Sequence, residues 1–542
     1  MKFSKDMHYT LMLRILATLV IIFTANLPAV ALADCDNFNS AAFFSAADAL
    51  LVQQCLENGA SLIDEDSDGL TPLFHAVENA KDPLVVDHIF NSARESGIEY
   101  AVGSHKFNGR SVAHYAAAEA IDPAMLTWLS KNGVNVLSTL DYECGEGWFA
   151  FCVEPIHLAA DREDGFLHVA TLLSLGADRL VRDNNDLSVN DRVLMSANIQ
   201  LNTLSLVSDD WPAIVHGAFL DSSVTSLERA GREPCSNFLS EDFFASANLE
   251  QVIYCVSAGA SPRAVDINAN TAIHLAAKTT SDPLVIDYLL YSLYQGDIES
   301  VGRVLDQTNN RVFTPLHLAA EANDNPEVAA RLIAWGADVD FLGGTNKEIR
   351  TFGENRGVTP VHLVLARNDA ARESLLAVLL AAGADLRQAD HNGYRAIHFA
   401  ALNQPNYRVI SFLQQIDTNL KGMFQGLASL QRDDRSFTAL HLAVSRDANI
   451  ETIQLMLEFG FSADDQSSSE SGRVTPLMVA AEFNTHSDVF FRLLDFSEEP
   501  CYQGPDGRTV EGLLRRNSQL MNYDSTGQQR SPLSAYKEKC PN

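Results

Sequence analysis

Residues 314–320 read Thr-Pro-Leu-His-Leu-Ala-Ala, and residues 336–340 read Gly-Ala-Asp-Val-Asp. Threonine is a good helix N-cap, and proline suits the first helical position because its missing N–H would have no intrahelical partner there. A first helix is therefore expected to begin at Pro315. Glycine is the residue that most readily takes the left-handed conformation at a helix end, so Gly336 marks the end of a second helix.

This pattern recurs along the chain. Between its two parts, Val328, Ala329, Leu332 and Ile333 fall at helical spacing and form an apolar stripe. One helix pair cannot bury such a stripe alone, so neighbouring copies must stack. Further copies, some of them weaker, begin at Thr71, Ser111, Pro155, Thr271, Thr359, Ala396, Thr438 and Thr475.

The recurring pattern resembles the ankyrin repeat, whose family sequence is T-P-L-H-x-A-A, a second helix, and then G-A-D and a turn. The resemblance covers nearly all of the chain after residue 33. It implies an all-α solenoid of about a dozen helix-loop-helix repeats with short β-turn fingers. It also implies that the concave face and the fingers bind protein partners.

The sequence also has a second, longer period that spans several repeats. The segment that begins at Cys35 and the segment that begins at Cys235 match at a constant offset of 200 residues, Phe43 and Phe44 matching Phe243 and Phe244. We infer two duplicated halves. The predicted domains are a signal peptide (1–33), a first repeat block (34–208), a junction (209–233), a second repeat block (234–498) and a C-terminal capping segment (499–542).

The N-terminus has the features of an export signal. Basic residues precede an apolar run at 15–23, and Ala31-Leu32-Ala33 is a small-x-small cleavage site. The run is too short for a comfortable membrane span of about 20 residues, so we expect no membrane insertion after cleavage. Lipidation of Cys35 is the alternative, although Asp34 departs from the required small neutral residue. The predicted location is periplasmic or secreted, and the lack of an N-x-S/T sequon favours a bacterial source.

The chain contains 8 cysteines, an even number suited to an oxidising compartment. Their spacing predicts local disulfides, with zinc as the rival use, although no C-x-x-C or nearby histidine pair supplies a ligand set. The predicted pairs are Cys35 with Cys55, Cys144 with Cys152, Cys235 with Cys255, and Cys501 with Cys540.

A formal net charge of −31 opposes binding to nucleic acid, which requires a basic surface. The same charge disfavours anionic membrane surfaces. It permits a basic protein partner, and it also serves to keep a large surface soluble.

The histidines and carboxylates give no catalytic pattern, and we predict no enzyme activity, cofactor or metal site. The resemblance assigns a structural role to the histidines of the T-P-L-H slot. Asp64, Asp66, Asp68 and Gly69 resemble the start of a calcium loop, but its twelfth position is His75 instead of glutamate. The slot histidines are His114, His157, His274, His317, His362, His398 and His441.

Two departures from the repeat are candidate partner-binding sites. The first is an aromatic loop between Cys144 and Cys152, and the second is a long insertion at residues 341–356. Each has a structural alternative: the aromatic side chains cover the solenoid edge, or the insertion is a loop without a partner. The candidate residues are Trp148, Phe149, Phe151, Lys347, Arg350 and Phe352.

The sequence therefore predicts an exported scaffold that holds, protects or inhibits a partner protein. A secreted effector or toxin-immunity factor is the alternative, because it would share all of these features. An enzyme built on the array is a third hypothesis, which requires a cleft of buried carboxylates.

Overall fold

The computed structural model describes most of the chain after residue 34. The chain forms two compact units, Met1–Pro155 and Ile156–Asn542. The described residues are 35–81, 83–98, 106–107, 110–137, 153–183, 185–195, 201–208, 211, 214–215, 235–294, 298–344, 357–367, 369, 371–390, 393–403, 407–416, 428–429, 436–467, 473–521 and 531–541.

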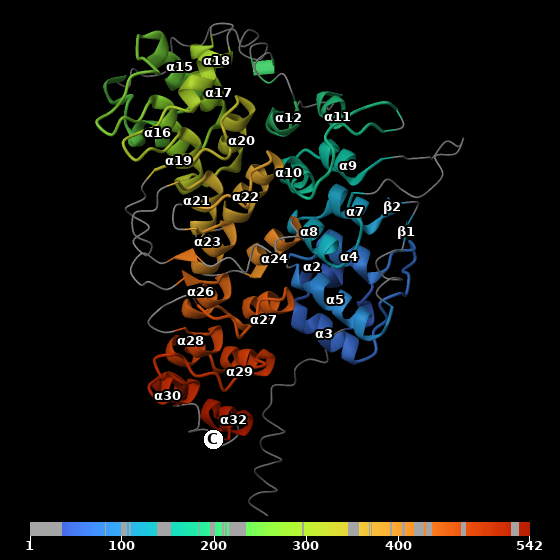
Figure 1. Cartoon of the computed structure of the whole chain (residues 1–542). Coiled ribbons are helices and arrows are strands. Elements are labelled where there is room, and N and C mark those ends of the chain that lie inside the picture. Colours follow the sequence, from blue (N-terminus) through green and yellow to red (C-terminus); the bar gives the residue numbers. More distant parts are fainter. Residues whose placement is uncertain are drawn as a thin grey trace, which may run out of the picture. The chain divides into compact units, whose positions relative to one another are not determined.

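The first unit consists of short helices joined by turns (Figure 1). Its elements are η1 (Cys35–Asn37), α2 (Ala41–Ala46), α3 (Ala49–Glu57), α4 (Pro72–Asn79), α5 (Leu84–Glu95), β1 (Lys106–Phe107), β2 (Arg110–Ser111), α7 (Val112–Glu119) and α8 (Ala124–Lys131).

The second unit continues the same alternation of helices, starting with α9 (Pro155–Asp161) at the boundary. Its other elements are α10 (Phe166–Ser174), α11 (Val189–Met195), α12 (Leu201–Val207), η2 (Cys235–Asn237), α14 (Glu241–Ser246), α15 (Leu249–Ser257), α16 (Ala272–Thr279), α17 (Pro283–Leu293), α18 (Ile298–Leu305), α19 (Pro315–Ala322), α20 (Pro326–Ala334), α21 (Pro360–Ala366), α22 (Ala371–Ala381), α23 (Ala396–Leu402), α24 (Tyr407–Ile416), β3 (Ala428–Ser429), β4 (Ser436–Phe437), α26 (Ala439–Ser445), α27 (Ile450–Glu458), α28 (Pro476–Phe483), α29 (Ser487–Phe496), α30 (Val510–Leu514), α31 (Ser518–Met521) and α32 (Pro532–Lys539).

The helices begin where the sequence predicts. Pro315 is the first residue of α19, and the Thr314 hydroxyl accepts a hydrogen bond from the backbone N–H of His317. In the described residues, the strands are limited to the two-residue hairpins β1–β2 and β3–β4. The all-α class is therefore confirmed for the described part of the chain, whereas the number of repeats and the duplicated halves stay predictions.

Helices in the second unit stack in two layers. First helices α16, α19, α21, α23, α26, α28 and α30 contact one another in that order, as Figure 1 shows. Second helices pack beside them, and in α20 the predicted stripe residues Val328, Ala329 and Leu332 are buried. Burial of this stripe between neighbours is the main stabilising contribution, at about 25 cal/mol for each Å² of apolar surface.

Buried imidazoles join consecutive repeats. His274, His317 and His441 each lie with Nε2 at 3.0–3.1 Å from a backbone carbonyl of the next repeat, those of Phe313, Val358 and Val474. The Nδ1 atom of each accepts the backbone N–H of the threonine three residues before it. Because Nδ1 accepts, the proton is on Nε2, which therefore donates to the carbonyl. The slot histidines in these repeats are structural.

The second unit also contains a packing that the repeat pattern does not predict. Helix α10 lies against α22, and α12 lies against α20, although these pairs are far apart in the sequence (Figure 1). Both α10 and α22 bury residues around most of their circumference. A helix that is apolar on more than one face requires a second partner, and here each helix provides it for the other.

A buried polar cluster holds this packing in register. The Asp287 carboxylate on α17 accepts hydrogen bonds from the indole N–H groups of Trp335, at 2.9 Å, and Trp211, at 3.1 Å. Arg331 on α20 lies 3.1 Å from the second carboxylate oxygen and stacks over the Trp211 ring. Burial raises the pKa of Asp287, and the Arg331 charge opposes that rise. Trp211 comes from the predicted junction, for which no packing role was expected.

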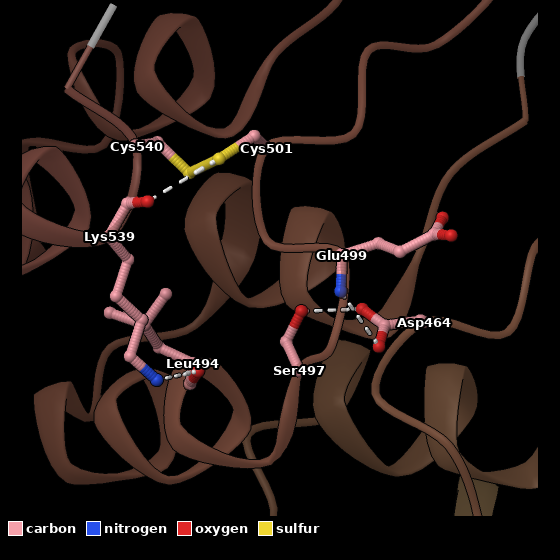
Figure 2. The surroundings of a disulfide bond; sticks show 7 residues. All are labelled: Asp464, Leu494, Ser497, Glu499, Cys501, Lys539 and Cys540. Atoms are coloured by element: carbon pink, nitrogen blue, oxygen red, sulfur yellow. Dashed lines mark hydrogen bonds between the residues drawn. A yellow bond between two sulfur atoms is a disulfide. The ribbon is translucent and has the colours of Figure 1, made fainter.

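Disulfides lie at the start of each predicted block and at the C-terminal end. Cys35 is bonded to Cys55, and Cys235 to Cys255, each across 20 residues. Figure 2 shows the third bond, between Cys501 and Cys540. Beside it, Lys539 Nζ donates to the carbonyl of Leu494. The last helix is thereby fastened to α29.

Several predictions about chain organisation fall outside the described residues. The signal peptide at 1–33 and most of the junction at 209–233 lie there, as do Cys144 and Cys152. The boundary between the compact units is near Pro155, earlier than the predicted junction. The two divisions measure different properties, contact density and sequence repetition, so the predicted domain limits stay predictions.

Replacing His317 with glutamine tests the role of the buried imidazoles. Burial lowers the pKa of His317 to about 4, whereas an unfolded imidazole titrates near about 6.5. The unfolded state therefore binds a proton first, and the parent loses stability as pH falls from about 6.5 toward 4. The His317→Gln variant lacks this loss. We expect the variant to have a lower melting temperature than the parent at pH 7. As pH falls, the difference between their free energies of unfolding should narrow by up to about 1.4 kcal/mol per pH unit.

Melting curves at pH 7, 6 and 5 measure that difference in stability between the parent and the variant. Exposed His486, changed to glutamine, is the matched control for the substitution itself. A difference for His317→Gln that stays constant over this range would contradict the assignment.

Replacing Asp287 with asparagine tests the buried cluster. Asparagine keeps an oxygen for the indole N–H groups but leaves the Arg331 charge buried without its carboxylate. We expect a loss of about 3–5 kcal/mol, measured by urea unfolding. The double variant Asp287→Asn/Arg331→Met removes the unpaired charge and should recover most of the loss. Additive losses in the double variant would show that the pair does not act as a unit.

Candidate protein-binding surface

Three consecutive turns of the second unit form a continuous surface, which we call the finger row: residues 261–271, 306–314 and 338–344. Each turn lies between a second helix and the first helix of the next repeat, so their positions are fixed by the stacked helices. The row is therefore a surface built on a rigid support.

Side chains close the first two turns locally. Asp266 Oδ1 accepts the backbone N–H groups of Asn268 and Asn270, at 2.8 and 2.7 Å. In the next turn, Asn309 Oδ1 accepts the N–H groups of Arg311 and Phe313 in the same way. Short polar side chains that bond to the backbone a few residues on are the usual means of fixing such turns. The sequence therefore determines each turn by itself.

Hydrogen bonds also link one turn to the next. The backbone N–H of Asn310 donates to the carbonyl of Asn268 at 2.9 Å, and that of Gly344 donates to the carbonyl of Val312 at 3.0 Å. A side chain at position 344 would meet Val312 and the carbonyl of Arg311, so glycine permits this close approach. The three turns consequently form one connected edge.

Apolar side chains are exposed along this edge. Ile267 is 94% exposed, and Val265, Val312 and Leu342 are each close to half exposed, at 48%, 47% and 44%. Single exposed apolar residues are common, but here they occur on three consecutive turns that are bonded together. Such an arrangement is suited to contact with a protein surface.

Val312 has an unfavourable backbone conformation. Its φ is +58°, which is rare for a β-branched residue. The same turn position is glycine at Gly69, Gly357, Gly393 and Gly507, and it is Asp186 or Ala269 in two other turns, all with positive φ. Residues held in such conformations cost about 1–3 kcal/mol and are concentrated at functional sites. A valine at this place is therefore difficult to explain by stability alone.

Carboxylates lie at the base of the row. Burial and the neighbouring charge of Asp338 raise the pKa of Asp306. Burial also raises the pKa of Asp340, and the charges of Asp385 and Asp338 act in the same direction. These effects show that several acidic groups share one region. The finger row thus places acidic groups beside its apolar tips, together with Arg263 and Arg311, of which Arg311 is paired with Glu321.

The candidate residues chosen from the sequence are not placed by the structure. Trp148, Phe149 and Phe151 of the aromatic loop, and Lys347, Arg350 and Phe352 of the insertion, lie outside the described residues. The first residues of the insertion, including Leu342, belong to the finger row. Sequence reasoning missed Ile267 and Val312. Their signal was available: each is a large apolar residue in a turn where a polar residue or glycine is usual.

The calcium-like segment is engaged in its own turn. Asp66 Oδ1 accepts the backbone N–H groups of Asp68 and Leu70, and its Oδ2 lies 2.8 Å from His75 Nε2. Partial burial raises the pKa of Asp66, but these hydrogen bonds lower it overall. Within the described ranges, no group of three or more metal-ligating side chains is arranged to hold an ion.

In the part of the chain that the structure describes, no helix is both long and apolar enough to cross a membrane.

Comparison with known proteins identifies the repeats. Residues 313–343 match the family model for the ankyrin repeat, and residues 363–414 match the one described as ankyrin repeats in many copies. A putative ankyrin repeat protein of fowlpox virus is 34% identical over 107 residues, 20% of this chain and 26% of the viral protein. The mouse B-cell lymphoma 3 protein homolog is 30% identical over 152 residues, 28% of this chain and 30% of the mouse protein.

An alpha-latrotoxin of Latrodectus geometricus is 27% identical over 145 residues, 27% of this chain but 9% of the toxin. The matches thus span less than a third of each of these relatives. One matched segment, 313–343, contains the Thr314 to His317 pattern and residues 338–343 of the third turn of the finger row. The chain therefore carries ankyrin repeats, over residues 313–343 and 363–414.

Proposed function

We propose that this protein is an exported scaffold that binds a partner protein through the finger row and so holds, protects or inhibits that partner. Ankyrin repeats in general mediate protein–protein interaction. The observation that carries the proposal is the exposed apolar edge of Ile267, Val312 and Leu342 on three bonded turns. Preformed turns lose little conformational entropy on binding, which favours affinity.

A substitution at Val312 is expected to affect partner binding and folding stability in opposite directions. Its strained backbone and its half-exposed side chain both disfavour valine in the free protein. A partner that covers the side chain would offset that cost, because burial of an apolar side chain contributes about 1.5–3 kcal/mol. Binding would thus account for a large apolar residue at a position where other turns have glycine, alanine or aspartate.

The test is a double variant, Ile267→Ser/Val312→Gly. Glycine relieves the positive φ but adds freedom to the unfolded chain, so the melting temperature should be equal to or above that of the parent. Binding should fall at least tenfold, because two apolar contacts are removed. The measurement is quantitative mass spectrometry of proteins captured by the parent and the variant from the exported fractions of the native organism.

Phe496→Ser provides the matched control. Phe496 is also an exposed apolar residue of the second unit, but it lies at the end of α29, away from these turns. The proposal requires one partner that the parent and this control retain in equal amount and that the double variant loses. Equal recovery by all three proteins would contradict it.

Export has its own test. If the signal peptide is removed after Ala33, the mature protein begins at Asp34, with Cys35 in its disulfide to Cys55. N-terminal sequencing and the intact mass without reductant should both agree with that product. A mass increased by acyl chains on Cys35 would support lipidation, and a retained Met1 would contradict cleavage.

A further inference from the structure

The first unit contains a pocket that is separate from the finger row. It lies between α3, α5 and the turn after α3, and it has a volume of about 590 Å³. Pockets of roughly 300–1,000 Å³ are typical of sites for small or short ligands. Its apolar lining includes Leu56, Ile63 and Ile98, and its polar lining includes Glu57, His88 and Glu95. The pocket is therefore partly apolar and partly acidic.

The chain contains a natural comparison for this pocket 200 residues further on. Helices α3 (Ala49–Glu57) and α15 (Leu249–Ser257) occupy corresponding positions, each with its disulfide to the preceding 3-10 helix. The rings of Phe38, Phe43 and Phe44 are arranged like those of Phe238, Phe243 and Phe244, with centroids 5.0–5.6 Å apart in both sets. The local framework is the same at both places.

The side chains that face the gap between the second helices differ. Tyr288 and Tyr291 of α17 stand where α5 has His88 and Asn91. The Tyr288 hydroxyl forms a hydrogen bond with Ser257, so it bridges α17 and α15. At the corresponding position, α3 has Glu57. Two half-buried tyrosines thus stand on α17 at the positions where the smaller His88 and Asn91 line the pocket on α5.

His88 has unused hydrogen-bonding capacity at this pocket. Within the described part of the first unit, its Nδ1 atom is buried and has no hydrogen-bond partner. A buried polar atom without a partner costs about 1–3 kcal/mol. Because that nitrogen has almost no accessible surface, a ligand in the pocket would contact the rest of the imidazole ring.

The charges of the pocket select the kind of ligand. Glu57 and Glu95 lie on its two sides, and among the described lining residues there is no lysine or arginine. Gln53 donates a neutral hydrogen bond to Glu57, and Arg94 lies at the rim, where it donates to Asn91. A ligand that places a positive charge between the two carboxylates and an apolar group on Leu56, Ile63 and Ile98 would be complementary.

We infer that the pocket between α3 and α5 binds a short peptide segment of a partner protein in which a lysine or arginine stands next to an apolar residue. This inference rests on the proposed protein-binding function but uses a different surface in the other compact unit. The two surfaces can therefore fail independently, and separate variants distinguish them.

The experiment uses the full chain and two tripeptides, acetyl-Leu-Arg-Leu-amide and acetyl-Leu-Glu-Leu-amide, with affinity measured by isothermal titration calorimetry. The arginine peptide should bind at least tenfold more tightly than the glutamate peptide, and its affinity should decrease as salt is raised. No binding of the arginine peptide to the parent at millimolar concentration, or equal binding of the two peptides, would overturn the inference.

The decisive variant is His88→Tyr/Asn91→Tyr, which introduces the side chains that the corresponding helix already holds. It should keep the parent melting temperature and lose at least tenfold in affinity for the arginine peptide. Because both glutamates stand at exposed positions, the variant Glu57→Gln/Glu95→Gln should fold normally. It should bind the arginine peptide less tightly than the parent, and this binding should no longer depend on salt. Unchanged affinity in either double variant would overturn the inference.

The finger-row variant Ile267→Ser/Val312→Gly serves as the control that separates the two proposals. It should bind the arginine peptide with the parent affinity, since it leaves the first unit unchanged. A loss of peptide affinity in this variant would place the peptide on the finger row and would overturn the pocket as the site.

Discussion

The hydrogen bond from a buried imidazole to the backbone of the next repeat is the interaction on which the second unit depends. His317 donates to the carbonyl of Val358, while its Nδ1 accepts the N–H of Thr314. One side chain therefore fixes the start of its own helix and the position of the following turn. Because burial lowers the pKa of these imidazoles, they stay neutral and can serve both bonds.

The same regularity produces the finger row. Once the helices are stacked, the turns between them lie at a repeated spacing and bond to one another, as Asn310 does to Asn268. The stacked helices then hold Val312 in its unfavourable backbone conformation, because the surrounding turn determines its φ angle. Binding residues can vary on these turns without disturbing the helices, which is the general advantage of a repeat architecture.

Each unit has features of its own at positions that depart from the repeat pattern. The Asp287, Arg331, Trp211 and Trp335 cluster joins α17 and α20 to a segment outside their own repeats. In the first unit, His88 and Asn91 line a pocket, and tyrosines stand at the corresponding positions of α17. In both cases the framework is shared, and a few side chains determine what the surface can contact.

The sequence by itself determined the helix starts and the helical class, because these depend on local caps and on a period repeated many times. The structural role of the slot histidines was implied by the resemblance to the ankyrin repeat. It also indicated cysteine pairs that lie close in the chain. Only the tertiary structure decided that α10 packs on α22, that Trp211 is buried against Asp287, and that Ile267 and Val312 share one edge. These contacts join residues far apart in sequence, and periodicity shows that a face is apolar without showing which distant segment covers it.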